Sequence, residues 1–214
     1  MKLHLGCGER YLDGYTNIDY PKSEHSVQQN TKVDRYADIS QLAFPTGTIE
    51  EVRLHHVFEH FSRPVATAFI ATWSQWLRSE GKLRIEVPDL QMMSKILTNT
   101  RIPLKERRVA ERHLFGSHEA HWAVHWCGYD EDMFRDLLNR FGFYVSNVER
   151  NSWMGTHNLE VFAVKREFIN RDSLATIGRE YLRDFLLDDG PSESLLLDAL
   201  TSDFKKQLDK GLNS

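Results

Sequence analysis

The sequence predicts an α/β protein with a three-layer, mostly parallel sheet, and three observations lead to that class. Apolar runs of strand length alternate with amphipathic helical segments, which is typical of sheets covered by helices. The first apolar run ends in a Gly-x-Gly turn, Gly6-Cys7-Gly8. The last two runs, residues 143–148 and 159–164, are separated by ten residues without a helical pattern. We therefore expect an antiparallel hairpin at one edge of the sheet.

Composition sets the broad class. The chain has 214 residues, of which 41% are hydrophobic and 27% charged, as in soluble globular proteins, and this length suits one domain with a sizeable core. A net charge of −4 provides no general attraction for phosphates, so no nucleic-acid partner is expected. No apolar run approaches 18 residues. We therefore predict neither a membrane span nor a signal peptide, and a cytoplasmic location.

The first half of the chain contains four predicted strands. Their ranges are residues 2–6, 15–19, 33–39 and 52–57. The connection 9–14 is too short for a crossover helix and holds at most one helical turn. Residues 21–32 and 41–47 are polar or contain proline and glycine, and we expect loops there.

A helix and a further strand follow. The helix should begin after Ser62, with Pro64 in its first turn, and end at Gly81. Its apolar residues recur at helical spacing, which indicates packing against a sheet. Residues 82–87 form the next predicted strand.

The central region is less regular. Residues 89–97 should begin a helix, and the basic run 101–112 is more often a solvated helix face than an anion-binding patch. Residues 113–129 are rich in His and Trp without clean periodicity. A second clear amphipathic helix should begin after Asp130 and end at Gly142.

The C-terminal segment is predicted to be a helical extension. Residues 166–214 are polar and helical in pattern, and Asp189-Gly190-Pro191 should divide them into two helices. We expect residues 1–165 to form the main domain, with the extension packed on it or capping it.

The Gly-x-Gly turn indicates a nucleoside-cofactor site. Gly6 and Gly8 allow a sharp turn and let a ligand approach the backbone closely. Asp19 follows eleven residues after Gly8, at the tip of the next predicted strand. A carboxylate there is suited to accept hydrogen bonds from a ribose diol.

The ordered motifs resemble class I S-adenosylmethionine-dependent methyltransferases, and most closely the small bacterial branch associated with polysaccharide and cell-surface glycan genes. The resemblance covers about residues 2–165. The matching motifs are Leu5-Gly6-Cys7-Gly8, Gly14-x-x-Asn17-x-Asp19, Leu42-Ala43-Phe44-Pro45, His56-Val57-Phe58-Glu59-His60, Leu77-x-x-x-Gly81-x-Leu83-x-Ile85-x-Val87-Pro88-Asp89 and Leu137-Leu138-x-x-x-Gly142-Phe143.

The resemblance implies a Rossmann-like sheet of seven strands in the order 3-2-1-4-5-7-6, with strand seven antiparallel. The hairpin expected from the last two apolar runs agrees with this order independently. The resemblance also implies S-adenosylmethionine as cofactor, S-adenosylhomocysteine as product, and binding across the carboxyl ends of strands one, two and four.

The resemblance assigns the cofactor residues one by one. Gly6, Cys7 and Gly8 would line the methionine and ribose, and Asp19 would take the ribose hydroxyls, with Tyr20 beside the adenosine. Cys7 also suits close packing in the turn, so we interpret it as structural rather than nucleophilic.

The resemblance places three further cofactor residues later in the chain. Asp38 would accept from the adenine amino group, Ile39 would lie against the ring, and His56 near the methionine. Two departures from the family are visible: the connection after Gly8 is short, and no helix precedes the first strand. The polar C-terminal extension is a candidate for the cover that such a helix gives in many relatives.

The acceptor side is predicted from histidines. Methyl transfer requires placement of the nucleophile, and a hydroxyl acceptor also needs a general base, most often His or a carboxylate. Our candidates are His121, His118, His60 and Glu59. A single His is more often a satisfied polar group, whereas the cluster favours a functional role.

No metal site is predicted. His121 and His125 are four residues apart and could share a metal on a helix, with His118 nearby. However, no carboxylate or thiolate stands at ligand spacing to complete such a set. Trp122 and Trp126 could stack against a sugar face or belong to the core.

We expect an S-adenosylmethionine-dependent methyltransferase that methylates an oxygen of a sugar or glycan-like acceptor with a His or Glu base. One alternative is a non-catalytic module with the same fold, which uses the helical extension to dock a partner. Another is an NAD-dependent oxidoreductase, but Tyr11 stands where the dinucleotide fingerprint needs glycine. The expected partner is the small-molecule or glycan acceptor, and a homodimer is left open.

Overall fold

The computed structural model describes residues 1–21, 23 and 31–213. Most of the predicted polar loop 21–32 therefore lies outside the described residues. The described residues form one mixed sheet in the order β3-β2-β1-β4-β5-β7-β6. Its strands are β1 Lys2–Leu5, β2 Thr16–Asp19, β3 Arg35–Tyr36, β4 Ile49–His55, β5 Leu77–Pro88, β6 Phe143–Trp153 and β7 Thr156–Lys165.

The strand order and directions confirm the predicted fold class. β3, β2, β1, β4 and β5 run parallel to one another, and β7 pairs antiparallel with both β5 and β6. The helices are α1 Arg63–Trp76, α2 Leu90–Thr98, α3 Leu104–Phe115, α4 Glu131–Arg140, α5 Arg171–Arg183 and α6 Pro191–Leu212, with short 3-10 turns η2 Ile39–Gln41 and η3 Phe58–His60.

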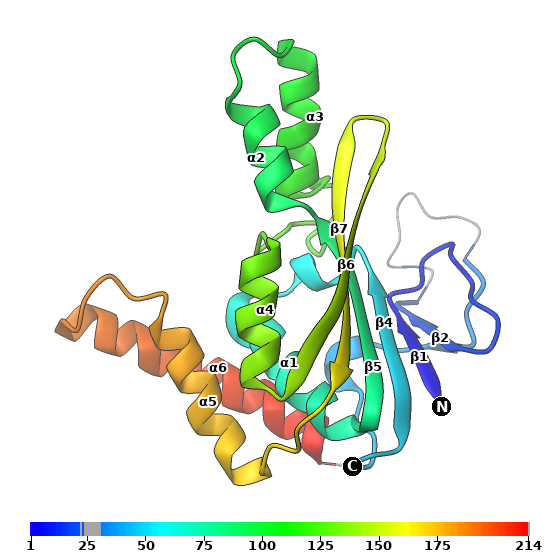
Figure 1. The fold of residues 1–214 in the computed structure, drawn as a ribbon, viewed down its shortest axis with the longest axis vertical. Coiled ribbons are helices and arrows are strands. Elements are labelled where there is room, and N and C mark those ends of the chain that lie inside the picture. The colour runs from blue at the N-terminus through cyan, green and yellow to red at the C-terminus, as the bar shows by residue number, and fades with distance from the viewer. Residues whose placement is uncertain (22, 24–30, 214) are drawn as a thin grey trace.

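The helices α1, α4, α5 and α6 lie together on one side of the sheet (Figure 1). Val52 and Leu54 of β4 are fully buried in the core on that side. Because side chains alternate along a strand, Arg53 points to the opposite side, where its guanidinium lies 3.8 Å from Glu160 of β7. Within the described residues, the connection between β1 and β2 forms turns and η2 is a single 3-10 turn, so neither supplies a full helix to the sheet.

Several predicted boundaries were wrong for identifiable reasons. The third strand covers only Arg35–Tyr36 rather than residues 33–39, because Asp38 leaves the sheet and caps η2 by accepting from the Ser40 N–H at 2.7 Å. The fourth strand begins at Ile49 and ends at His55. The first long helix ends at Trp76 instead of at Gly81.

Gly81 lies within β5, at an irregularity of the sheet. Leu77 already pairs with Ile49, and pairing resumes between Lys82 and Glu51. A Cβ on Gly81 would lie 2.7 Å from the backbone oxygen of Arg78. The glycine is therefore explained by close backbone approach within the bulge rather than by a helix end.

The edge hairpin is longer than predicted. β6 and β7 are joined at Met154-Gly155 and extend past the other strands toward α2 and α3 (Figure 1). The hairpin therefore carries residues 151–158 above the carboxyl ends of the parallel strands.

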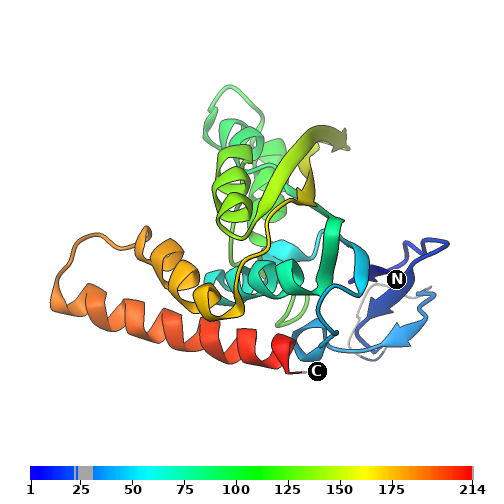
Figure 2. The same cartoon turned by 60° about the horizontal axis from the view of Figure 1, so that its bottom comes forward.

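The C-terminal extension forms two helices, divided where predicted. α5 ends at Arg183 and α6 begins at Pro191. Both pack against α1, as Figure 2 shows from below. Trp76 Nε1 donates to the Gly211 carbonyl at 2.9 Å, and a Cβ on Gly211 would lie 2.4 Å from the Thr72 side chain. α6 therefore lies very close to α1.

Candidate active site

The glycine turn is fixed by the strands on both sides of it. Gly6 has a φ of 66° and Gly8 a φ of 53°, values that favour glycine. A Cβ on Gly6 would lie 2.4 Å from the Val57 side chain. The Gly6 N–H donates to the Ile18 carbonyl of β2 at 2.8 Å.

Asp19 connects the end of β2 to this turn. One carboxylate oxygen accepts a hydrogen bond from the Gly8 N–H, and the other accepts from the Tyr20 N–H at 2.7 Å. Asp19 is buried, and it lines the same cavity as both glycines. A carboxylate in this place is of the type that accepts hydrogen bonds from ligand hydroxyl groups.

The first cavity lies at the carboxyl ends of β1, β2 and β4 and has a volume of about 830 Å³. The structure brings all eight predicted cofactor residues to its walls: Gly6, Cys7, Gly8, Asp19, Tyr20, Asp38, Ile39 and His56. These residues come from four separate segments of the chain. Parallel strands that end at one edge explain their convergence.

A second cavity, of about 770 Å³, adjoins the first. The two cavities share the walls Arg10, His55, His56, His60 and Trp122. The second cavity is also lined by the tip of the edge hairpin, including Trp153 and Thr156. The two hollows are therefore compartments of one site.

His56 lies at the junction, between two carboxylates. Its Nδ1 is 3.3 Å from Glu59 and its Nε2 is 3.5 Å from Glu86. Burial alone would lower the pKa of His56, but the hydrogen bonds to Glu59 and Glu86 outweigh it and raise the pKa to about 9. His56 also adopts a φ of 54°, a strained conformation that is concentrated at functional sites.

Both carboxylates are held in the ionised form. Burial would raise the pKa of Glu59, but its hydrogen bond to His56 and the nearby histidines lower it. Burial likewise opposes ionisation of Glu86, and the hydrogen bonds from His55 and His56 lower its pKa. The junction therefore contains an imidazolium between two carboxylates.

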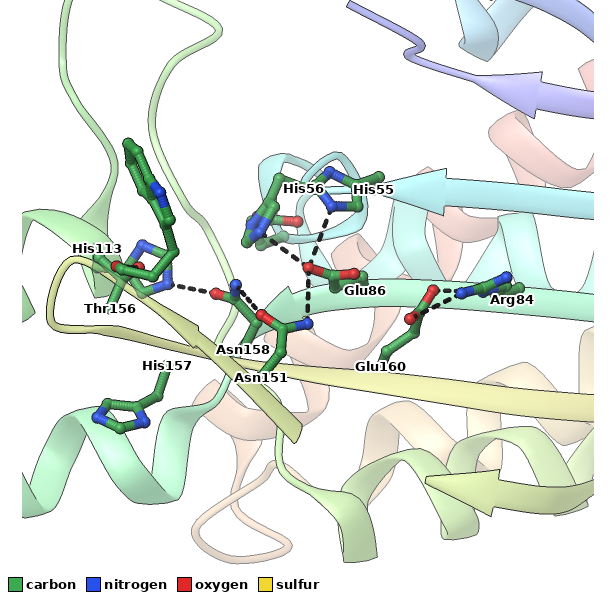
Figure 3. A network of polar contacts seen from close by, with 12 residues as sticks. His55, His56, Arg84, Glu86, His113, Asn151, Thr156, His157, Asn158 and Glu160 are labelled. Atoms are coloured by element: carbon green, nitrogen blue, oxygen red, sulfur yellow. Dashed lines mark hydrogen bonds and ion pairs between the residues drawn. The ribbon is translucent and has the colours of Figure 1, made fainter. Parts of the chain in front are cut away.

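A chain of hydrogen bonds extends from Glu86 to His113 (Figure 3). Asn151 Nδ2 donates to Glu86 at 3.4 Å, and Asn158 Nδ2 donates to Asn151 Oδ1 at 2.8 Å. His113 Nε2 lies 2.8 Å from Asn158 Oδ1. Because Glu86 can only accept, the amide directions follow, and His113 Nε2 is the donor.

The sequence did not predict this chain of hydrogen bonds. Its members lie on β5, the edge hairpin and α3, and nothing in their spacing links them. Burial lowers the pKa of His113. One signal could have located part of this chain of hydrogen bonds. The strand order 3-2-1-4-5-7-6 places strand seven beside strand five, and this pairing sets Asn158 opposite Pro88.

The four predicted catalytic residues separate in the structure. His60 lines both cavities, Glu59 the second and His121 the first. His118 lines neither cavity: it has a φ of 58° and its Nε2 donates to the Phe115 carbonyl at 2.9 Å. Residues 116–128 form turns and extended chain, so the idea of His121 and His125 on one helical face was wrong.

Two sets of His and Glu side chains within the described residues are compact enough to be considered for a metal ion. They are His55, His56 and Glu86, and Glu59, His60 and His125. The glycine turn and Asp19, which are the candidates for binding a nucleoside, belong to neither set and line the first cavity.

The comparisons with known proteins bear on the fold. No family model and no curated protein matches the sequence. Solved structures do match it. One is the complex between the Trm112 methyltransferase activator and a candidate methyltransferase of Haloferax volcanii, with a TM-score of 0.54, 11% identity, and coverage of 79% of this chain and 83% of that chain.

Two further matches are structures with S-adenosylhomocysteine bound. The 1,6-didemethyltoxoflavin-N1-methyltransferase of Burkholderia thailandensis has a TM-score of 0.52 and 16% identity, with 77% of this chain and 70% of that chain covered. The magnesium protoporphyrin IX methyltransferase of Synechocystis has a TM-score of 0.50 and 16% identity, with 78% and 74% covered. This is the class I methyltransferase fold.

Within this methyltransferase fold, one side chain organises the connection from β1 to β2. Asn17 accepts from the Leu12 N–H at 2.9 Å and donates to the Leu12 carbonyl at 3.0 Å. It also donates to Asp34 at 2.9 Å and contacts His4 Nδ1 at 3.1 Å. The turn region that replaces a helix is therefore held by a fully buried amide.

Of the two places considered for the C-terminal extension, the structure shows packing on the domain: α5 and α6 contact α1. Of the residues that the structure describes, none from the extension lines either cavity. His121 and Trp122, from the segment before α4, do line the first cavity. Among the described helices, none combines the length and apolar character needed to span a bilayer.

Proposed function

We propose that the protein is an S-adenosylmethionine-dependent methyltransferase. The observation that carries this proposal is the first cavity, whose walls include all eight residues assigned to the cofactor from the motifs. Asp19, bonded to the glycine turn, would accept from the ribose hydroxyls. Two solved structures of this fold hold S-adenosylhomocysteine, which supports the choice of cofactor.

We propose the second cavity as the acceptor compartment. It adjoins the first cavity through shared walls, so an acceptor there can reach a methyl group presented from the first. Its walls include Trp122 and Trp153 beside several polar side chains. Aromatic faces among convergent polar groups suit a sugar or glycan-like acceptor. The association with polysaccharide biosynthesis rests on the sequence resemblance.

Methylation of a hydroxyl requires loss of its proton. The His/Glu groups at the junction, His60 and Glu59, are the best placed of the predicted candidates, with His121 on the side of the first cavity. His60 Nδ1 donates to the Val124 carbonyl at 3.2 Å. This bond fixes the ring and leaves Nε2 for the site.

Calorimetric titration tests the cofactor assignment. We expect S-adenosylmethionine and S-adenosylhomocysteine to bind with one-to-one stoichiometry and NAD not to bind. Binding of NAD alone would overturn the proposal in favour of an oxidoreductase. Turnover can then be screened with radiolabelled methyl donor on a panel of sugars and nucleotide sugars. Cofactor binding without turnover on a broad panel would favour a non-catalytic module.

A further inference from the structure

We propose that Glu59, His60 and His125 form a binding site for a divalent transition-metal ion, best matched by Zn²⁺. Each residue offers one ligand atom, and the three atoms lie within 4.8 Å of one another. All three residues line the second cavity. No spacing in the sequence predicts this set, because Glu59 and His60 lie far along the chain from His125.

Backbone hydrogen bonds explain how these residues meet. The Glu59 carbonyl in η3 accepts from the Trp126 N–H at 2.8 Å, and the His125 N–H donates to the Phe115 carbonyl at 3.1 Å. The backbone around His125 is therefore hydrogen-bonded both to η3 and to the end of α3. His125 Nε2 consequently lies 4.0 Å from Glu59 Oε1, and the His60 and His125 rings are 4.6 Å apart between centroids.

The orientation of His60 is typical of a metal ligand. Its Nδ1 donates to the Val124 carbonyl at 3.2 Å, which leaves Nε2 as the atom that faces the site. Histidines that bind metals usually hold their other ring nitrogen in this way, because the bond fixes the tautomer and orients the ring.

Glu59 supplies an independent observation. Its side chain is 1% exposed, and its Oε1 is 3.3 Å from His56 Nδ1. Its Oε2 is buried and has no hydrogen-bond partner among the described residues. A buried carboxylate oxygen without a partner is costly and needs an explanation. A bound cation would satisfy it.

The neighbouring set, His55, His56 and Glu86, is held together by its own hydrogen bonds and ion pairs and does not require a bound ion. His55 Nε2 and His56 Nε2 lie 3.1 Å and 3.5 Å from the same oxygen, Glu86 Oε1. Asn151 also donates to that oxygen. Because these donors already converge on the carboxylate, we assign the metal to Glu59 and not to Glu86.

The donor set indicates the kind of ion. Two imidazole nitrogens and one carboxylate oxygen suit Zn²⁺ and similar metals, with distances of about 2.0–2.2 Å and an open position for a further ligand. Mg²⁺ prefers an all-oxygen set.

The open position would face the acceptor compartment, and its use in catalysis rests on the proposed function. A hydroxyl bound to the ion would lose its proton to water more readily. Its oxygen then forms the bond to the methyl carbon while the sulfur–methyl bond breaks and its electron pair returns to sulfur. The products are the methyl ether and S-adenosylhomocysteine. In this arrangement Glu59 and His60 would act as ligands of the ion instead of taking the hydroxyl proton themselves.

The test uses the full-length protein without a histidine tag, titrated with Zn²⁺ in a calorimeter. We expect one tight site in the unaltered protein. H125N and E59Q should weaken Zn²⁺ binding by roughly tenfold or more. H118N is the matched control, because His118 belongs to the same segment but lines neither cavity; it should leave affinity unchanged.

Absence of Zn²⁺ binding, or equal affinity in H125N and the unaltered protein, would overturn the site. Loss of binding in E86Q with full binding in H125N would overturn the choice of ligands. E59Q removes the charge beside His56 and can impair folding. The decisive variant for the metal site is therefore H125N, whose fold is checked by circular dichroism. Titration of the same samples with S-adenosylhomocysteine separates the two proposals: cofactor binding without Zn²⁺ overturns the metal site alone, and the converse overturns the proposed function alone.

Discussion

Asp19 stabilises the glycine turn before any ligand arrives. Its carboxylate accepts from the N–H groups of Gly8 and Tyr20, so the turn is already folded in the shape that surrounds the first cavity. A ligand that enters the first cavity would therefore meet a site that needs little reorganisation, which favours affinity.

We expect Asp19→Ala to weaken S-adenosylhomocysteine binding by about 1–3 kcal/mol, because backbone donors and the ribose hydroxyls would lose their acceptor. Calorimetry on the variant measures this change. Asp13→Ala, which alters an exposed carboxylate of the same connection, should bind normally. Unchanged affinity in Asp19→Ala would remove the ribose assignment.

Cys7 should be chemically unreactive in the folded protein. Burial, followed by the nearby Asp19 carboxylate, raises the pKa of its thiol to about 12. A raised pKa keeps the thiol protonated, and only the thiolate reacts. Iodoacetamide should therefore alkylate Cys7 slowly from pH 7 to 9, and faster only as the pH approaches 12. Peptide mass spectrometry reads the extent, with urea-unfolded protein as the reactive control; rapid labelling at pH 8 would contradict the burial argument.

The helices and strands show where local sequence decides structure and where packing decides it. Asp130 accepts from the Met133 N–H at 2.9 Å and begins α4 as predicted, because an N-cap is a local interaction. The end of α1 was mispredicted, because Leu77 pairs with Ile49 across the sheet and no local signal reports that pairing.

Between α5 and α6, the contact at Gly178 sets the helix spacing. A Cβ on Gly178 would lie 2.3 Å from the buried Phe204 ring. In an exposed helix, Gly→Ala stabilises by up to about 1 kcal/mol. Here we expect Gly178→Ala to destabilise by about 1–3 kcal/mol through overpacking, measured by urea denaturation. Leu195→Ala, at a side chain that is 72% exposed on α6, is the control and should change stability little. A stabilised Gly178→Ala protein would refute this packing.

At the scale of the whole molecule, the C-terminal extension completes the core rather than covering the site. Leu174, Leu182, Leu197, Phe204 and Leu208 belong to the same buried cluster as the strands. The extension also reaches η2, where Gln207 Nε2 donates to the Ser40 carbonyl at 2.9 Å.

Removal of residues 170–214 should therefore prevent stable folding, since it would expose the buried surface that α1 turns toward α5 and α6. Circular dichroism and thermal denaturation of the truncated chain measure this, with Leu195→Ala as the full-length comparison. A truncated protein that melts cooperatively at the same temperature and binds the cofactor normally would show that the extension is dispensable.

Part of the site geometry could be predicted from the chain. The eight residues predicted for the cofactor follow strand ends, and the topology brings them to the walls of the first cavity. The second cavity could not be predicted, because Asn151, Asn158 and Trp153 reach it only through the unexpected length of the edge hairpin. The association of Glu59 with His125 also depends on a long-range backbone contact that has no periodic signature.

The position of α6 has a consequence for how this protein is made. The Trp76 indole bonds to Gly211, 135 residues later in the chain. At a synthesis rate of about 5–20 residues per second, α1 would wait roughly 7–27 s for that partner. During this interval the sheet can pair, but one apolar face of α1 stays uncovered on the ribosome. Nascent chains of this protein should therefore be targets for chaperones until α6 emerges and docks.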